Sequence, residues 1–169
     1  SFLNKLFFAS FPILILGFFF RHLISENLRT LDIIAISTIF FGLLLWVADR
    51  TSSKNPSNES ISFRHAFLIG LAQCLALIPG TSRSAITIIC ALFLSYSRVI
   101  ASKFAFMLAV PTLSIIFLSE IVSLNFSSLT TDWFDIVLVF VFSFLSSYLC
   151  IGLFLKLIER IGFTPFVIY

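Results

Sequence analysis

The sequence contains very few charged residues. Asp, Glu, Lys and Arg make up 11% of its 169 residues, whereas a soluble domain carries roughly 25%. Hydrophobic residues make up 59%, and the mean hydropathy is +1.10. So few charges cannot cover a surface that faces water, which argues against a soluble enzyme, a disordered chain or a nucleic-acid-binding module. We expect the lipid bilayer as the solvent and no nucleic acid as a partner.

Cysteine is also scarce. The three cysteines are an odd number, each lies inside an apolar run, and their spacing does not suit a metal site. They are Cys74, Cys90 and Cys150. The sequence therefore predicts small buried thiols, with neither a disulfide framework nor metal-ligating residues.

Methionine is nearly absent as well. The chain starts at Ser1, its one methionine is Met107, and no signal-peptide pattern precedes the first apolar run. The last residues, 163–169, begin a renewed apolar stretch. We interpret residues 1–169 as a single membrane domain that is a piece of a larger membrane protein.

Long apolar runs are abundant. A membrane-spanning helix needs about 20 mostly apolar residues, and four segments qualify. They are residues 2–20, 31–47, 101–122 and 133–155. Residues 66–94 differ, because two shorter apolar arms flank the polar, turn-forming residues 79–84. The pattern predicts an all-α integral membrane protein: a multi-span helical bundle with a re-entrant helical hairpin at residues 66–94.

The basic residues support the hairpin. If it enters and leaves on one side, eight of the eleven Lys and Arg residues lie on the cytoplasmic side, as the positive-inside rule expects. These eight are Lys5, Arg50, Lys54, Arg64, Arg98, Lys103, Lys156 and Arg160, with Arg21 and Arg29 on the outer side. The remaining one, Arg83, is then at the tip of the hairpin, inside the membrane.

The tip of the predicted hairpin is the best candidate for a functional site. Pro79 disfavours helix at Ile78, and Gly80 permits backbone angles that other residues avoid. The next residues can cap a new helix, whose N-terminus offers free N–H donors to an anion. A guanidinium, several hydroxyl groups and a helix N-terminus together suit a phosphate group. The candidates are Gly80, Thr81, Ser82, Arg83, Ser84 and Thr87.

Two alternatives are left open at this point. The turn at residues 79–84 is also compatible with an ordinary helix break, with Arg83 reaching the interface. However, an ionisable residue inside the membrane is by default a functional-site hypothesis. Gln73 is a further substrate-binding candidate, although a hydrogen bond to another helix would explain it equally well. The sequence has no Gly-x-x-x-x-Gly-Lys phosphate loop.

Residues 79–87, Pro-Gly-Thr-Ser-Arg-Ser-Ala-Ile-Thr, match a family signature at every fixed position, Pro-Gly-x-Ser-Arg-Ser-x-x-Thr. Together with residues 66–78, 97–98, 101–111 and 157–169, they make the chain resemble the bacterial undecaprenyl-diphosphate phosphatases, the bacitracin-resistance family. The likeness is strongest from Ile61 to Pro111. It corresponds to the C-terminal portion of that family, the second half of an inverted-repeat architecture.

The resemblance implies a multi-pass enzyme of the bacterial inner membrane that removes the terminal phosphate of undecaprenyl diphosphate. This hydrolase would regenerate the lipid carrier for peptidoglycan synthesis in the cell wall. By position, Ser82 is the nucleophile or a hydroxyl ligand, Arg83 binds the diphosphate, and Ser84 and Thr87 support it. The resemblance also implies a divalent cation, Mg²⁺ or Ca²⁺.

The carboxylates that the family associates with this cation belong to a glutamate-rich signature that this chain does not contain. Two alternative functions therefore stay open. One is a lipid or ion transporter built on the re-entrant hairpin, since such hairpins also form transport sites. The other is an inactive fragment.

Overall fold

The computed structural model describes residues 2–27, 30–52, 60–123 and 133–168. Within these ranges the chain is entirely helical apart from its connecting turns. The elements, in chain order, are α1 (Phe2–Asn27), α2 (Leu31–Thr51), α3 (Phe63–Gln73), the 3-10 helix η1 (Cys74–Leu77), α4 (Arg83–Phe93), α5 (Arg98–Ser123), α6 (Trp133–Ile161) and α7 (Thr164–Ile168).

Four of these helices are long and apolar enough to cross a membrane, namely α1, α2, α5 and α6. The predicted all-helical, multi-span fold is therefore confirmed, and the chain is a multi-pass membrane protein. The helices extend past the predicted apolar cores because polar residues continue the same helical turns. For example, α6 runs on to Ile161 through Lys156 and Arg160.

The segment between α2 and α5 forms the predicted helical hairpin. Its two outer ends lie together, because the Tyr96 hydroxyl accepts a hydrogen bond from the Ser62 backbone N–H (3.3 Å) and lies 2.7 Å from His65 Nδ1. Its tip packs beside Ser37 of α2, six residues from the start of that helix. At 1.5 Å per residue this is about 9 Å along α2. The hairpin thus turns back within the length of a spanning helix, which is re-entrant geometry.

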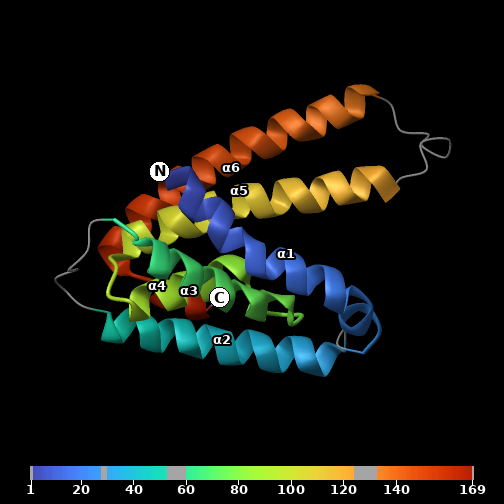
Figure 1. The fold of residues 1–169 in the computed structure, drawn as a ribbon. Helices are drawn as coiled ribbons and strands as arrows, with labels where there is room; N and C mark the ends of the chain where they lie inside the picture. The colour runs from blue at the N-terminus through green and yellow to red at the C-terminus, as the bar shows by residue number, and fades with distance from the viewer. Residues whose placement is uncertain (1, 28–29, 53–59, 124–132, 169) are drawn as a thin grey trace.

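The hairpin occupies the centre of the bundle. Figure 1 shows α3 and α4 between α1 and α2, with α5 and α6 extending together from the other side. Packing around the hairpin is close: a Cβ atom at Gly70 of α3 would overlap the backbone of Ala9 in α1. Small residues at such crossings let membrane helices approach. By contrast, α6 contributes a single buried residue, Ile158, so the core lies around the hairpin.

Several of the described basic residues lie at one end of the bundle, away from the tip of the hairpin that carries Arg83. Lys5 at the start of α1 donates to the Ile61 carbonyl oxygen (2.7 Å), next to the base of the hairpin. Arg98 at the start of α5 pairs with Asp49 near the end of α2. Lys54 and Arg29 lie outside the described residues, as does the side chain of Arg21.

A buried carboxylate joins three segments at this end. Asp49 is 5% exposed; its Oδ1 accepts from Arg98 Nε (2.6 Å), and its Oδ2 accepts from the Phe163 backbone N–H (3.0 Å). Gly162, just before Phe163, has φ +73°, and a Cβ there would press on Asp49 and Arg98. The carboxylate therefore fixes the turn between α6 and α7 against α2 and α5.

We expect Asp49→Ala to destabilise the fold by about 2 kcal/mol, because a half-buried guanidinium and a buried N–H lose their acceptor. Thermal unfolding in detergent measures this loss. Glu159→Ala, which removes an exposed carboxylate from α6, serves as the control and should leave the melting temperature unchanged. Equal melting temperatures for the two variants would show that the Asp49 contacts contribute no net stability.

Candidate functional site

The tip of the hairpin is a tight turn set by Pro79 and Gly80. Ile78 is extended (φ −73°, ψ 123°), as expected for a residue before proline. The Thr81 N–H donates to the Ile78 carbonyl oxygen (3.1 Å), and Gly80 has φ +90°. Proline followed by a glycine of positive φ is the pattern of a type II turn. This turn reverses the chain beside α2.

Helix α4 starts directly after the turn, with Ser82 as its N-cap. The Ser82 Oγ accepts a hydrogen bond from the Ala85 N–H (3.4 Å) and lies 3.3 Å from the Ser84 Oγ. The backbone N–H groups of Arg83 and Ser84 make no hydrogen bond to any described residue. Free N–H groups at a helix N-terminus carry partial positive charge, so this end of α4 favours an anion.

The turn is held by hydroxyl groups of α2. Ser37 Oγ lies 2.5 Å from the Pro79 carbonyl oxygen, and Thr38 Oγ1 lies 3.1 Å from the Gly80 carbonyl oxygen. Each hydroxyl shares its one hydrogen between the turn and a carbonyl oxygen of α2, that of Ile33 (2.6 Å) or Ile34 (2.7 Å). Gly80 lies so close to α2 that a Cβ atom would overlap Ser37 Oγ and the Ile34 backbone. These contacts satisfy backbone acceptors that a turn inside a membrane would otherwise leave without a partner.

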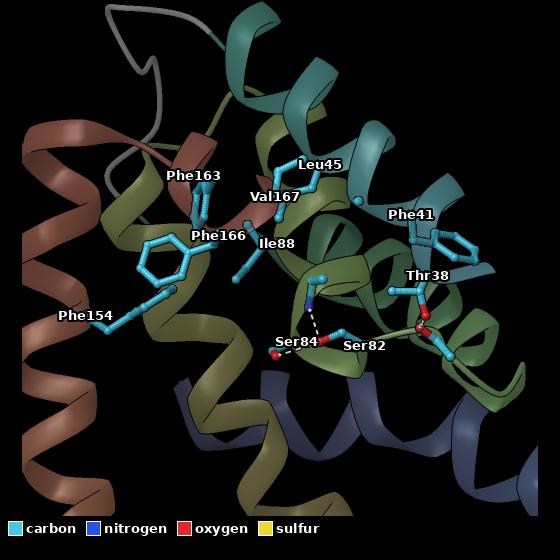
Figure 2. A pocket seen from close by; sticks show the side chains of 13 residues that line it. Thr38, Phe41, Leu45, Ser82, Ser84, Ile88, Phe154, Phe163, Phe166 and Val167 are labelled. Atoms are coloured by element: carbon cyan, nitrogen blue, oxygen red, sulfur yellow. Dashed lines mark hydrogen bonds between the residues drawn. The ribbon is translucent and has the colours of Figure 1, made fainter. Parts of the chain in front are cut away.

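A cavity of about 280 Å³ opens beside the turn, between α2, α4 and the segment from α6 to α7 (Figure 2). It combines a few polar groups with an apolar lining, which is typical of ligand pockets. Its lining residues are Thr38, Phe41, Gly42, Leu45, Gly80, Ser82, Ser84, Ala85, Ile88, Phe154, Phe163, Phe166 and Val167.

Three of the predicted site residues line this cavity: Gly80, Ser82 and Ser84. Thr87 does not. It is 1% exposed, and its hydroxyl group contacts the carbonyl oxygens of Arg83 (3.1 Å) and Ser84 (2.9 Å). Its observed contacts are thus with the backbone of the first turn of α4, which is a supporting position.

Gln73 and Thr81 also lie off the cavity. The buried Gln73 donates from Nε2 to Thr112 Oγ1 of α5 (3.3 Å), and Thr112 in turn lies 3.4 Å from Ser10 Oγ of α1. This is the helix-to-helix hydrogen bond that the sequence left as an alternative. The Thr81 hydroxyl is shielded within the turn and makes no hydrogen bond to a described residue.

Arg83 is the first residue of α4 and is half-buried. Among the described residues, none forms a hydrogen bond or an ion pair with its guanidinium group. A half-buried cation without a carboxylate partner, next to two free N–H groups, makes the tip of the hairpin electropositive. An anionic ligand would supply the missing partner.

Sequence reasoning missed the contribution of α2 and of the C-terminal aromatic residues. Ser37 and Thr38 are adjacent hydroxyl residues in an otherwise apolar span, and that local polarity was the available signal. Phe154, Phe163 and Phe166 carried no such signal, because the chain has 23 phenylalanines. Only the fold selects the few that reach the cavity.

The described residues do not fit the divalent cation that the resemblance implies. No group of three or more His, Cys, Asp or Glu side chains that could hold a metal occurs in the described part of the chain. Hydroxyl groups and a guanidinium are at the tip, whereas Mg²⁺ and Ca²⁺ prefer several oxygen ligands including carboxylates.

Comparison with known proteins gives a consistent result. The family model described as bacitracin resistance protein BacA matches residues 1–169. An undecaprenyl-diphosphatase of Alteromonas mediterranea is 45% identical over 161 residues, which cover 95% of this chain and 60% of the relative. Undecaprenyl-diphosphatase 1 of Pseudoalteromonas translucida is 44% identical, again over 95% of this chain and 60% of the relative. An undecaprenyl-diphosphatase of Teredinibacter turnerae is 45% identical over 95% of this chain and 61% of the relative. The chain thus spans about three-fifths of the length of these relatives.

We expect Gly80→Ala to displace the tip of the hairpin from α2 and to destabilise the fold by about 1–3 kcal/mol, because the new Cβ combines positive φ with overlap on α2. Thermal unfolding in detergent measures this. Gly152→Ala is the matched control, since a Cβ at Gly152 meets nothing within 4 Å. If the two variants unfold at the same temperature, the close approach at Gly80 does not constrain the turn.

Proposed function

The chain belongs to the bacitracin resistance protein BacA family, and we propose that it forms the phosphate-binding part of an undecaprenyl-diphosphate phosphatase. The enzyme hydrolyses the terminal phosphate of undecaprenyl diphosphate and regenerates undecaprenyl phosphate for cell-wall synthesis. The observation that carries this proposal is the tip of the hairpin, where Arg83, two free N–H groups and the hydroxyls of Ser82 and Ser84 meet. The names of the relatives support the same substrate.

In this proposal the tip binds the diphosphate by charge and by hydrogen bonding. The Arg83 guanidinium offers a forked set of donors to phosphate oxygens, and the N–H groups of Arg83 and Ser84 add two more. Phosphoryl transfer depends mainly on positioning and on neutralising charge in the transition state. The described residues therefore suit the electrostatic part of the reaction.

The reaction itself is a hydrolysis. A new bond forms between the terminal phosphorus and the oxygen of the attacking group, and the bond from that phosphorus to the bridging oxygen breaks. Inorganic phosphate and the lipid monophosphate are the products after water is consumed. Ser82 serves either as the attacking group or as a hydroxyl ligand that orients the phosphate, and its position as the N-cap of α4 is compatible with both roles.

A divalent cation, Mg²⁺ or Ca²⁺, remains part of the proposal. Its carboxylate ligands would come from the additional length that the relatives have and this chain lacks. When bound, it would neutralise charge on the diphosphate.

The bacterial inner membrane is the proposed location, with the basic end of the bundle on the cytoplasmic side. In that orientation the hairpin enters from the cytoplasmic side, and its tip lies in the outer half of the membrane. A lipid diphosphate whose headgroup is at the outer surface would then meet Arg83 close to the interface. The proposed partners are thus the membrane and the lipid substrate.

Transport remains the competing function, since broken helices inside a membrane also build transport sites. Neither the matching family nor the names of the relatives favours it. Movement of a lipid or ion across vesicles by a protein that releases no phosphate would support transport.

We expect Arg83→Ala in the full-length protein to reduce phosphate release from undecaprenyl diphosphate by roughly 10³-fold, the scale of removing an arginine that stabilises a phosphoryl transition state. Inorganic phosphate, assayed in detergent micelles, is the measurement. Arg64→Ala removes an exposed arginine at the start of α3 and is the control, with turnover expected to stay at the wild-type level. Full turnover by the Arg83 variant would overturn the phosphatase proposal.

A further inference from the structure

We infer that the cavity beside the hairpin binds the isoprene units nearest the diphosphate, on an aromatic wall formed by Phe154, Phe163 and Phe166. The inference rests on the proposed function and adds which residues select the lipid part of the substrate. The polar end of the cavity, formed by Thr38, Gly80, Ser82 and Ser84, would take the diphosphate.

The side chains that line this cavity change from polar to apolar in the same direction along two helices, α2 and α4. On α4, Ser84 and Ile88 are four residues apart and share one face. On α2, Thr38 is followed on the lining face by Phe41 and Leu45. Both helices run from the level of the tip toward the basic end, so the lining changes from hydroxyl to hydrocarbon within about one turn. An amphipathic ligand with a charged head and an apolar chain matches this gradient.

The aromatic wall is on the apolar side. The rings of Phe154 and Phe166 are 4.8 Å apart between centroids, and those of Phe154 and Phe163 are 6.3 Å apart. Figure 2 shows these rings grouped on one side of the cavity, with Ser82 and Ser84 on the other and Ile88 between them. Phe163 is 1% exposed and is the buried ring of the wall, whereas Phe166 is 39% exposed. Phe166 therefore offers the most accessible ring to a ligand.

The Phe163 end of the wall is anchored to α2 and α5. The Phe163 N–H donates to the buried Asp49 carboxylate, which is itself paired with Arg98. Gly162 has no space for a side chain against that pair. Anchoring this end of the wall in advance lowers the ordering cost of binding.

The size of the cavity limits what it can hold. Its volume of about 280 Å³ is at the small end of ligand pockets, which span roughly 300–1,000 Å³. A diphosphate and the adjoining isoprene units suit such a space, while a long polyprenyl chain must continue into lipid.

The test uses the full-length protein in detergent with farnesyl diphosphate, which carries three isoprene units, and inorganic diphosphate as a competitive inhibitor that has only the head. We expect Phe166→Ala, and Phe154→Ala as a second variant, to raise KM for farnesyl diphosphate about tenfold. The kcat and the inhibition constant of inorganic diphosphate should stay within twofold. Phe140→Ala, which removes a 70% exposed ring from α6, is the control and should change neither.

An unchanged KM for farnesyl diphosphate, or an equal rise in this KM and in the inhibition constant of inorganic diphosphate, would show that the aromatic wall does not bind the isoprene units. Either result would leave the phosphatase proposal intact. A photoreactive farnesyl diphosphate analogue provides a readout that does not need turnover. Labelling of residues 154–167, located by mass spectrometry, would support the wall, and labelling confined to the lipid-facing residues 133–145 would overturn it. Labelling of residues 154–167 by a protein that releases no phosphate would support isoprene binding at the aromatic wall and would contradict the phosphatase proposal.

Discussion

The structure depends on how backbone groups are satisfied at a turn inside the membrane. The hairpin leaves helical geometry at Pro79 and Gly80, beside the spanning helix α2. Backbone groups that lose their helical partners within a membrane need other partners. The hydroxyls of Ser37 and Thr38 on α2 reach the carbonyl oxygens of these two residues. The hairpin can therefore end at this depth only because α2 passes directly beside it, without space for a side chain at Gly80.

This arrangement has an electrostatic consequence. The acceptors of the turn are bound by α2, whereas the first N–H donors of α4 and the Arg83 guanidinium have no partner among the described residues. Partial and full positive charges are thus concentrated at one point, and the partial burial of Arg83 strengthens its interaction with an anion. The same contacts that stabilise the turn produce a site suited to phosphate.

The base of the bundle has a complementary role. Asp49 joins α2, α5 and the turn before α7, and so determines where Phe163 and Phe166 lie relative to α4. A buried carboxylate is costly unless it is fully bonded, which makes this geometry specific. The chain consequently places the hydroxyls of Ser82 and Ser84 and an aromatic wall on the same cavity, held by two separate polar clusters. Ser37 and Asp49, one from each cluster, are twelve residues apart on α2, which is about 18 Å.

The sequence by itself determined the membrane location, the four long helices and the hairpin with its capped, Arg-bearing tip, because these follow from hydropathy and from local turn and capping preferences. It could not determine which distant residues meet that tip. Ser37, Thr38 and Asp49 contact polar groups more than 40 residues away, and Phe154 and Phe166 reach the cavity only through the path of α6 and α7. Thr87 and Gln73 share the polarity of the site residues, yet their hydroxyl and amide contact the backbone and a neighbouring helix. Tertiary structure decided these roles, because hydrogen-bond satisfaction in a bilayer depends on which helices are adjacent.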